Sequence, residues 1–360
     1  MKGVKNVPSI SVLMGIYNEK KKEQVKVAIS SILNQSYCDF EFIICDDGSP
    51  EEFFLWLQQY CRIDKRIRLL RNERNEGLSK ALNRCLAEAN GKYIARMDAD
   101  DVSLPNRFEK QINFLEKHSE YALAGCAVGL IDDKGIWGER VPVEKPQKTD
   151  FLWTSPFIHP SIMMKKSILQ YLNGYATDAY IERTEDYELF MRLYATGKVG
   201  YNLQEKLLLY REDRNAFIKR KYRYRINEAK VRYVGFGQLG IRKGNYKYII
   251  KPLVIGVLPG FVMQRFHKRQ KMIGIVILNY RNWDDTLRCI QSIVTNPPQE
   301  MYQIILVDNA SPNGPEFDLK TIIEKYNIVY IQNKKNKGYN AGNNVGIARA
   351  LELGCDAILI

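Results

Sequence analysis

Short apolar runs alternate along this chain with segments in which apolar residues recur at helical spacing. Residues 10–17 (ISVLMGIY) predict a buried strand, and residues 40–45 (FEFIIC) predict a second one. Between them, Val27, Ile29 and Leu33 belong to a segment that predicts an amphipathic helix. This alternation is typical of an α/β fold whose mostly parallel, doubly wound sheet is covered by helices on both faces.

The same pattern recurs near the other end of the chain. Residues 273–280 (IGIVILNY) repeat the first run, 287–294 the helix and 304–307 the second strand. Tyr17 and Tyr280 are 263 positions apart, and Asp46 and Asp308 are 262 positions apart. Landmarks in nearly constant register make chance similarity improbable, so the sequence predicts two copies of one fold.

These copies divide the chain into three predicted parts. A complete first domain is expected over residues 1–215, and the incomplete N-terminal part of a second over 272–360. The second copy ends two positions before the equivalent of Asp98, so we expect a truncated domain without turnover. The basic segment 216–271 is predicted to be helical and lies between them.

Charge is concentrated in that middle segment. The net charge is +13, and residues 211–271 carry 17 Lys and Arg against 3 Asp and Glu. Within it, residues 252–264 hold no charge but are interrupted by Pro259 and Gly260, and a bilayer span needs about 20 apolar residues. The run is too short to cross, and the pattern favours a helix at the surface of an anionic membrane.

Acidic side chains follow the predicted strands. Asp46 ends the second strand, and Asp98 and Asp100 follow the run at residues 92–95. Ligands of parallel sheets bind beyond the carboxyl ends of the strands. Two carboxylates two positions apart offer the hard oxygen ligands that suit Mn²⁺ or Mg²⁺. Taken alone, each acid is more often a solvated turn or a helix cap.

Two further positions have an ordinary structural interpretation beside a functional one. Glu185 and Asp186 precede apolar residues at helical spacing, and acids at a helix start favour the helix dipole. His159 is one of three histidines, and an isolated histidine is more often structural than catalytic.

Several motifs, in this order, resemble family 2 glycosyltransferases with the GT-A nucleotide-diphospho-sugar transferase fold over residues 8–215. They are 11–19 (SVLMGIYNE), 46–49 (DDGS), 74–78 (RNEGL), 96–101 (RMDADD), 105–107 (PNR) with Gln111, 159–161 (HPS) and 185–187 (EDY). The resemblance implies a metal-dependent, inverting transfer of a sugar from a nucleotide-diphosphate donor, most simply a UDP-hexose or UDP-N-acetylhexosamine. The acceptor it implies is a hydroxyl of a polyprenol-linked glycan in surface polysaccharide synthesis.

Roles for individual residues follow from this resemblance. Tyr17 and Glu19 match positions that frame the nucleoside, and Asp46 the aspartate that binds the uracil base. Asp98 and Asp100 match the D-x-D pair, with Asp100 the direct ligand of Mn²⁺ or Mg²⁺ and Asp98 serving the ribose or a metal-bound water.

Asp186 matches the catalytic base. Arg96 and His159 are further candidates, and so is Asp213, which stands where many relatives carry the histidine of a Tyr-Arg-x-His element. Residues 272–360 resemble a rhamnosyltransferase-like branch of the family. That copy lacks the metal aspartates and the base.

Other classes of protein explain the pattern less well. A dinucleotide-dependent oxidoreductase needs a glycine-rich turn after the first strand, and residues 18–21 (NEKK) contain no glycine. A nucleic-acid-binding protein could use residues 219–233, but this leaves the acidic strand ends unexplained, and we expect no nucleic-acid partner. A catalytically inactive sugar-nucleotide-binding module remains the other alternative.

The cysteine pattern bears on the compartment. Seven cysteines without a C-x-x-C pair favour a reducing cytosol. Together with the basic segment, this predicts a cytoplasmic enzyme held peripherally on the inner face of the plasma membrane.

Overall fold

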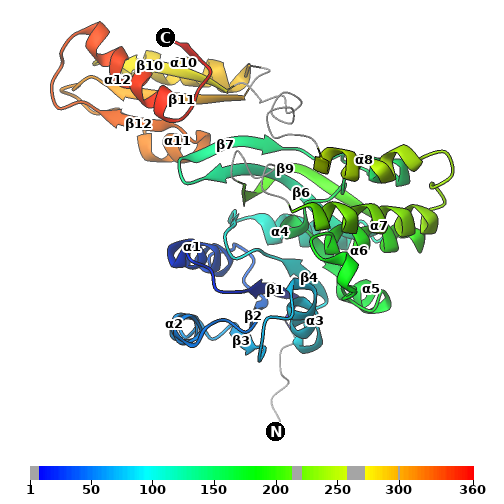
Figure 1. Cartoon of the computed structure of the whole chain (residues 1–360). Helices are drawn as coiled ribbons and strands as arrows, with labels where there is room; N and C mark the ends of the chain where they lie inside the picture. Colours follow the sequence, from blue (N-terminus) through cyan, green and yellow to red (C-terminus); the bar gives the residue numbers. More distant parts are fainter. Residues whose placement is uncertain (1–7, 213–220, 258–271, 299–300) are drawn as a thin grey trace. The chain divides into compact units, whose positions relative to one another are not determined.

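The structure is a computed structural model that describes residues 8–212, 221–257, 272–298 and 301–360 (Figure 1). The chain divides into two compact units. One comprises Met1–Leu130 and Glu139–Met263, and the other comprises Ile131–Gly138 and Gln264–Ile360. The first unit thus contains residues 1–215 of the predicted first domain except Ile131–Gly138, together with the described helices of the basic segment.

Nine strands of the described residues form the larger sheet, in the order β3-β2-β1-β4-β8-β6-β9-β5, with β7 paired to β6. The strands are β1 (Ile10–Ile16), β2 (Phe40–Asp46), β3 (Ile67–Arg71), β4 (Tyr93–Arg96), β5 (Val102–Ser103), β6 (Tyr121–Asp132), β7 (Gly135–Arg140), β8 (Met163–Lys165) and β9 (Val199–Arg211). The first four are parallel, whereas β8 pairs antiparallel with β4 and β6, and β5 with β9. The predicted α/β fold is confirmed, and antiparallel strands extend its parallel part.

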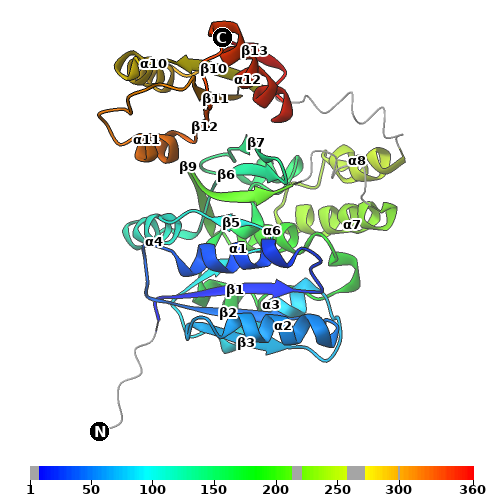
Figure 2. The same cartoon turned by 90° about the vertical axis from the view of Figure 1, so that its left-hand side faces the viewer.

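Helices cover both faces of the parallel strands. Those of this unit are α1 (Lys22–Leu33), α2 (Glu51–Cys61), α3 (Leu78–Glu88), α4 (Arg107–Lys117), α5 (Lys166–Tyr171), α6 (Glu185–Ala195), α7 (Tyr222–Gln238) and α8 (Tyr246–Val257), with short 3₁₀ turns η1 (Lys148–Leu152), η2 (His159–Ser161) and η3 (Ala179–Ile181). α1 and α2 lie on one side of β1–β3 and α3 on the other (Figures 1 and 2). All seven residues of β2 are buried, as a strand between two helical layers requires.

The buried face of α1 differs from the prediction. Val25, Ala28, Ile29 and Ile32 face the core at the spacing of one helical face, while Val27 is 50% exposed. The helix is therefore where the pattern placed it, but it is rotated relative to the residues first assigned to its apolar face.

The second unit contains a sheet with the strand order of the first. In its described residues the order is β12-β11-β10-β13, all parallel, which matches β3-β2-β1-β4 in chain order. Its elements are β10 (Met272–Asn279), α10 (Trp283–Thr295), β11 (Met301–Asp308), α11 (Leu319–Tyr326), β12 (Val329–Gln332), α12 (Tyr339–Glu352) and β13 (Ala357–Leu359). α12 packs on one face, and α10 and α11 on the other.

The basic segment contributes α7 and α8, which pack against each other. Among the described residues, no helix combines the length and apolar character needed to cross a bilayer. The predicted interfacial run continues beyond Val257, and residues 258–264 of it lie outside the described part of the chain.

Candidate active site

The neighbouring carboxyl ends of β1 and β2 place Tyr17 and Asp46 at one edge of the sheet. Ile16 pairs with Asp46 in parallel register, and the chain turns at Asn18, whose φ is 42°. The Asn18 amide donates to Ser49 Oγ at 2.8 Å, which joins the two turns. Tyr17 is 49% exposed, so its ring is accessible at this edge.

Asp46 is a buried carboxyl with an unused acceptor. Its Oδ2 accepts the Ser49 amide at 3.3 Å and lies 3.6 Å from Arg71 Nε, while its buried Oδ1 has no partner within the described residues. Burial raises the pKa of Asp46, and the contacts with Ser49 and Arg71 oppose this rise. A buried acceptor without a donor is costly, so this oxygen is suited to an N–H group of a ligand.

Asp47, the next residue, supports the loop instead. It accepts Asn72 Nδ2 at 2.6 Å and the backbone amides of Glu76 and Gly77, the latter at 2.7 Å. Gly77 has a φ of 92°, a conformation that glycine adopts without strain. In the DDGS turn, therefore, Asp46 keeps a buried oxygen without a donor in the described residues, and Asp47 anchors the loop.

Three acids follow the ends of β1 and β4, namely Glu19 after β1 and Asp98 and Asp100 after β4. Asp100 is half-buried, and its pKa is raised to about 6 by burial first and then by the charges of Asp98 and Glu19. Arg211, at the end of β9, partly offsets this repulsion. The structure thus brings Glu19, Asp98 and Asp100 into one region of negative potential.

Arg96 lies beneath this acidic group. It is 1% exposed, donates through Nη2 to Asp98 Oδ1 at 2.5 Å, and contacts the carbonyls of Leu13 and Met97 through Nη1. Because the guanidinium bonds both the β1 backbone and Asp98, it fixes that carboxylate relative to the sheet.

The Asp98–Asp100 pair fits a divalent cation. Hard cations such as Mg²⁺ are commonly held by one or two carboxylates together with oxygens of a bound phosphate ester. The mutual repulsion that raises the Asp100 pKa would be relieved by a cation between the carboxylates. Among the described residues, no group of three or more His, Cys, Asp or Glu side chains is arranged to hold a metal by itself.

Asp186 and Glu185 occupy the first turn of α6. The predicted buried face of this helix is confirmed, since Tyr187, Leu189, Phe190 and Leu193 are buried. Both acids are half-buried, and the pKa of Glu185 is raised to about 7, by burial first and then by the charge of Asp186. The helix dipole stabilises negative charge at this end.

Tyr175 connects the two acidic regions electrostatically. It is 3% exposed, and Arg96, Asp186 and Asp98 all influence its hydroxyl, although burial is the main cause of its raised pKa. The hydroxyl lies 2.9 Å from His159 Nε2. Burial lowers the pKa of His159 well below its usual range, so the ring is neutral and is suited to orienting Tyr175.

The PNR motif with Gln111 forms a buried support for these strands. Arg107 is fully buried and donates through Nη2 to the carbonyls of Arg96 at 2.8 Å and Ile162 at 3.3 Å. Gln111 accepts from Arg107 Nε and donates to the carbonyls of Ala124 and Ser161. α4 thereby ties β4, β6 and η2 together behind the site.

Asp101 has a structural role that the sequence analysis did not predict. It is 1% exposed and accepts the Arg211 amide at 2.7 Å, while Arg211 Nε donates to the carbonyl of Asp100 at 3.0 Å. These bonds join the end of β9 to the D-x-D turn. The third acid of RMDADD was the available signal, but its partner is 110 positions away.

Asp213 cannot be placed, because it lies outside the described residues. The other candidates occupy two places in the first unit. One group lies at the strand ends and comprises Tyr17, Glu19, Asp46, Arg96, Asp98 and Asp100. The other group consists of His159, which lies on η2, and Asp186, which lies on α6. Such an arrangement can bind a nucleotide and a cation at one place and accept a proton at the other.

Comparison with known proteins gives a consistent picture. Residues 11–172 and 274–352 match the sequence model of a family described as glycosyl transferase family 2. The putative glycosyltransferase EpsE of Bacillus subtilis is 40% identical over 266 residues, which cover 74% of this chain and 95% of that protein.

Two further similarities are more distant. An Escherichia coli protein named UDP-Gal:alpha-D-GlcNAc-diphosphoundecaprenol beta-1,3-galactosyltransferase is 29% identical over 63% of this chain and 83% of its own length. The crystal structure of S. aureus TarS residues 1–349 with UDP-GlcNAc superposes with a TM-score of 0.52 at 14% identity, covering 72% of this chain and 74% of that one. This last likeness concerns the fold alone.

Proposed function

The chain belongs to glycosyl transferase family 2 and is a glycosyltransferase, and we propose that it transfers a sugar from a UDP-sugar to a hydroxyl of a lipid-linked glycan. The observation that carries this proposal is the placement of Glu19 after β1 and of Asp98 and Asp100 after β4, strands that lie side by side in the sheet next to β2, which ends at Asp46. A bound diphosphate with a divalent cation would account for the acids Asp98 and Asp100, and a bound uracil base would account for the buried Asp46.

The nucleoside is proposed to lie over the β1 and β2 ends. Asp46 Oδ1, buried and without a partner in the described residues, accepts the imide N–H of uracil. Tyr17 is exposed enough for its ring to contact the base or ribose.

Asp100 and Asp98 are proposed to hold Mn²⁺ or Mg²⁺. Such a cation neutralises charge on the departing nucleoside diphosphate when it is bound. Arg96 keeps the Asp98 carboxylate in place through their short ion pair, and Glu19 adds to the negative potential.

Asp186 is proposed as the general base of a single displacement with inversion. The acceptor oxygen forms a bond to the anomeric carbon as the bond from that carbon to the diphosphate oxygen breaks. The acceptor hydroxyl proton passes to the Asp186 carboxylate. At the first turn of α6, the helix dipole favours the ionised carboxylate that the step requires.

The acceptor and location are proposed from charge and from a relative. The Escherichia coli relative acts, by its name, on a diphosphoundecaprenol-linked sugar. Residues 221–257 carry nine Lys and Arg and one acid, and basic residues near an anionic surface contribute about 1 kcal/mol each. We propose a cytoplasmic enzyme, peripheral on the inner membrane face, in surface polysaccharide assembly.

The second unit is proposed to be a rhamnosyltransferase-like copy without turnover of its own. It carries DNAS at residues 308–311 in place of DDGS. The chain is accordingly proposed to consist of a catalytic domain over residues 1–215, a basic segment over 216–271 and this second copy over 272–360.

The direct test of the base is Asp186→Asn in a transfer assay with a UDP-sugar panel. Because the amide cannot accept a proton, transfer should fall roughly 10²–10⁴-fold while UDP affinity, measured by calorimetry, stays the same. The control Asp178→Asn, an exposed acid eight positions earlier, should transfer normally. UDP binding without turnover by the wild type would favour an inactive module, and loss of UDP binding in Asp186→Asn would assign Asp186 to the donor.

A further inference from the structure

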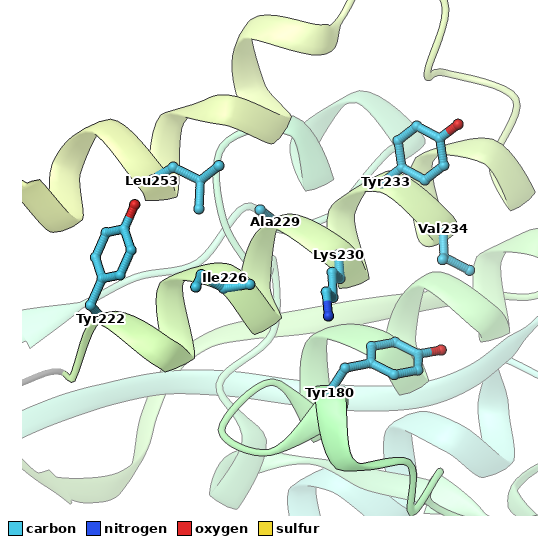
Figure 3. Close-up of a pocket in the computed structure, with 8 residues that line it drawn as sticks. All are labelled: Tyr180, Tyr222, Ile226, Ala229, Lys230, Tyr233, Val234 and Leu253. Carbon is cyan, nitrogen blue, oxygen red and sulfur yellow. The ribbon is translucent and has the colours of Figure 1, made fainter.

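A groove of about 690 Å³ runs along α7, far from the acidic strand ends in sequence. We call it the α7 groove: it is lined by six residues of α7 between Tyr222 and Val234, by Tyr180 of η3 and by Leu253 of α8 (Figure 3). Its volume falls in the range of about 300–1,000 Å³ found for small-molecule pockets.

The groove is formed by a face of α7 that the first unit leaves exposed. Val231, on the far side of the helix from the groove, is buried in the core, whereas Ile226 is 39% and Val234 43% exposed. Tyr222 and Tyr233 are also about half exposed. A contiguous apolar face of this kind marks an interaction site more often than chance exposure.

A single cation lies within this apolar lining. Lys230 extends from α7 toward Tyr180 (Figure 3). It is exposed, and no acid of the described residues forms an ion pair with it. An apolar groove with one cation is complementary to an amphiphile that has a hydrocarbon chain and an anionic head.

The groove adjoins the element that carries the proposed base. Tyr180 belongs to η3, whose last residue is four positions before the first residue of α6. Asp186 is six positions after Tyr180. Arg223 of α7 pairs with Glu182 at 3.1 Å, which fixes α7 beside this connection. A ligand in the groove is therefore held next to the segment leading to the acceptor side of the site.

We propose that the α7 groove binds the polyprenyl diphosphate part of the acceptor, with the isoprenoid chain against Ile226, Val234 and Leu253 and the diphosphate at Lys230. This rests on the proposed lipid-linked acceptor. A concave groove can contact a single isoprenoid chain on several sides, whereas binding to a bilayer requires apolar side chains that reach outward from the protein surface. Ile250 and Val254 of α8 are exposed and are not among the groove residues, so a bilayer could contact them without the groove.

The test uses farnesyl diphosphate as a water-soluble probe of the full chain, with binding measured by calorimetry. Ile226→Glu and Val234→Glu place a carboxylate in the groove and should each raise the Kd at least 10-fold, and Lys230→Glu should do the same. The matched control is Leu55→Glu on α2, because Leu55 is 53% exposed and lies outside the groove. It should leave the Kd unchanged, and circular dichroism melting should show all four variants folded.

Two comparisons distinguish binding of a lipid diphosphate in the groove from binding of diphosphate alone and from binding to a membrane. Inorganic diphosphate should bind at least 10-fold more weakly than farnesyl diphosphate, and equal binding would overturn the proposal. Ile250→Glu should weaken binding to phosphatidylglycerol vesicles but not to farnesyl diphosphate. If it weakens both equally, or if wild type fails to bind the probe at millimolar concentration, the groove is not a lipid-diphosphate site.

The outcome is independent of the donor reaction. A protein that binds UDP and turns over a UDP-sugar but ignores farnesyl diphosphate keeps the proposed transferase function and loses only the groove. A protein that binds farnesyl diphosphate through the groove without any UDP-sugar turnover keeps the groove and loses the transferase function.

Discussion

At the scale of residues, the first unit combines buried charges that serve different purposes. The buried Arg96 donates to Asp98, and Asp46 keeps one oxygen without a donor in the described residues. Glu185 is held half-buried next to Asp186, and this raises its pKa to about 7. Unfavourable burial of acids is typical of sites that bind cations or transfer protons.

Glu185 gives a prediction for stability against pH. Its pKa in the folded protein is raised from 4.5 to about 7, so its contribution is present below pH 4.5 and is lost as pH rises through 7. Glu185→Gln should therefore melt about 2–4 °C above wild type at pH 8, with a smaller difference at pH 5. Differential scanning calorimetry checks this, and Asp178→Asn is the control. An equal gain at both pH values would contradict the raised pKa.

The sequence predicted candidate residues from local patterns. Asp98, Asp100 and Asp186 each follow a strand or begin a helix, and the structure places them there. It could not identify Tyr175, which reaches His159 and lies near both acidic regions only after folding. Nothing in its own neighbourhood of the sequence signals that environment.

At the scale of elements, α4 determines how the strands behind the site are held. Arg107 and Gln111, one helical turn apart, satisfy four backbone carbonyls on three other segments. The sequence motif PNR with Gln111 thus has a structural explanation, since both side chains are fully buried and neither is exposed to a ligand.

Arg107→Met should destabilise the first unit by about 2–4 kcal/mol, because the carbonyls of Arg96 and Ile162 lose donors in a buried place. Urea unfolding should show a lower midpoint, and Lys117→Met on the exposed side of the same helix should change it little. A stability loss that is the same for both variants would show that these buried hydrogen bonds contribute nothing specific.

Periodicity predicted the first strands of each copy and the helix between them, but not the antiparallel strands that complete the larger sheet. The apolar run at β6 and the short β8 join the sheet antiparallel, through pairings between residues about 40 positions apart. Such pairing depends on distant segments and leaves no periodic trace in either strand. At α1 the pattern predicted a helix but assigned Val27, which is exposed, to its apolar face. Which side of a helix is buried depends on the strands against which it packs.

At the scale of the whole molecule, the two units repeat one order of parallel strands. The aspartates at equivalent positions in the two units, Asp46 and Asp308, have different hydrogen-bond partners. Asp308 occupies the position of Asp46 and likewise accepts the amide of the serine three residues on, here Ser311 at 3.1 Å. It differs from Asp46 in accepting Asn279 Nδ2 at 3.3 Å and Gln332 Nε2 at 3.5 Å as well, so that both of its oxygens have a donor. A cavity of about 510 Å³ lies beside it, lined by Asn279 and Asn309 among others. The sequence predicted this repeat from register alone, whereas the different hydrogen bonding appears only in the structure.

The matched pair Asp46→Asn and Asp308→Asn tests which copy carries the donor site. Asp46→Asn loses the acceptor charge proposed for uracil, so we expect UDP affinity to fall about 10-fold, in line with a charged hydrogen bond of 1.5–3 kcal/mol. Asp308→Asn should leave both UDP-sugar turnover and UDP affinity unchanged. If turnover depends on Asp308 instead, the second unit is not inert.

As proposed above, this chain is a metal-dependent UDP-sugar transferase whose cation is held by Asp98 and Asp100. The most direct measurement is UDP release from a UDP-sugar panel, with Mn²⁺ and with EDTA, for wild type and Asp100→Ala. We predict release in Mn²⁺, none in EDTA, and a rate about 100-fold lower in Asp100→Ala, as expected on losing a main electrostatic stabiliser. Full release in EDTA, or an Asp100→Ala rate equal to wild type, would contradict the account.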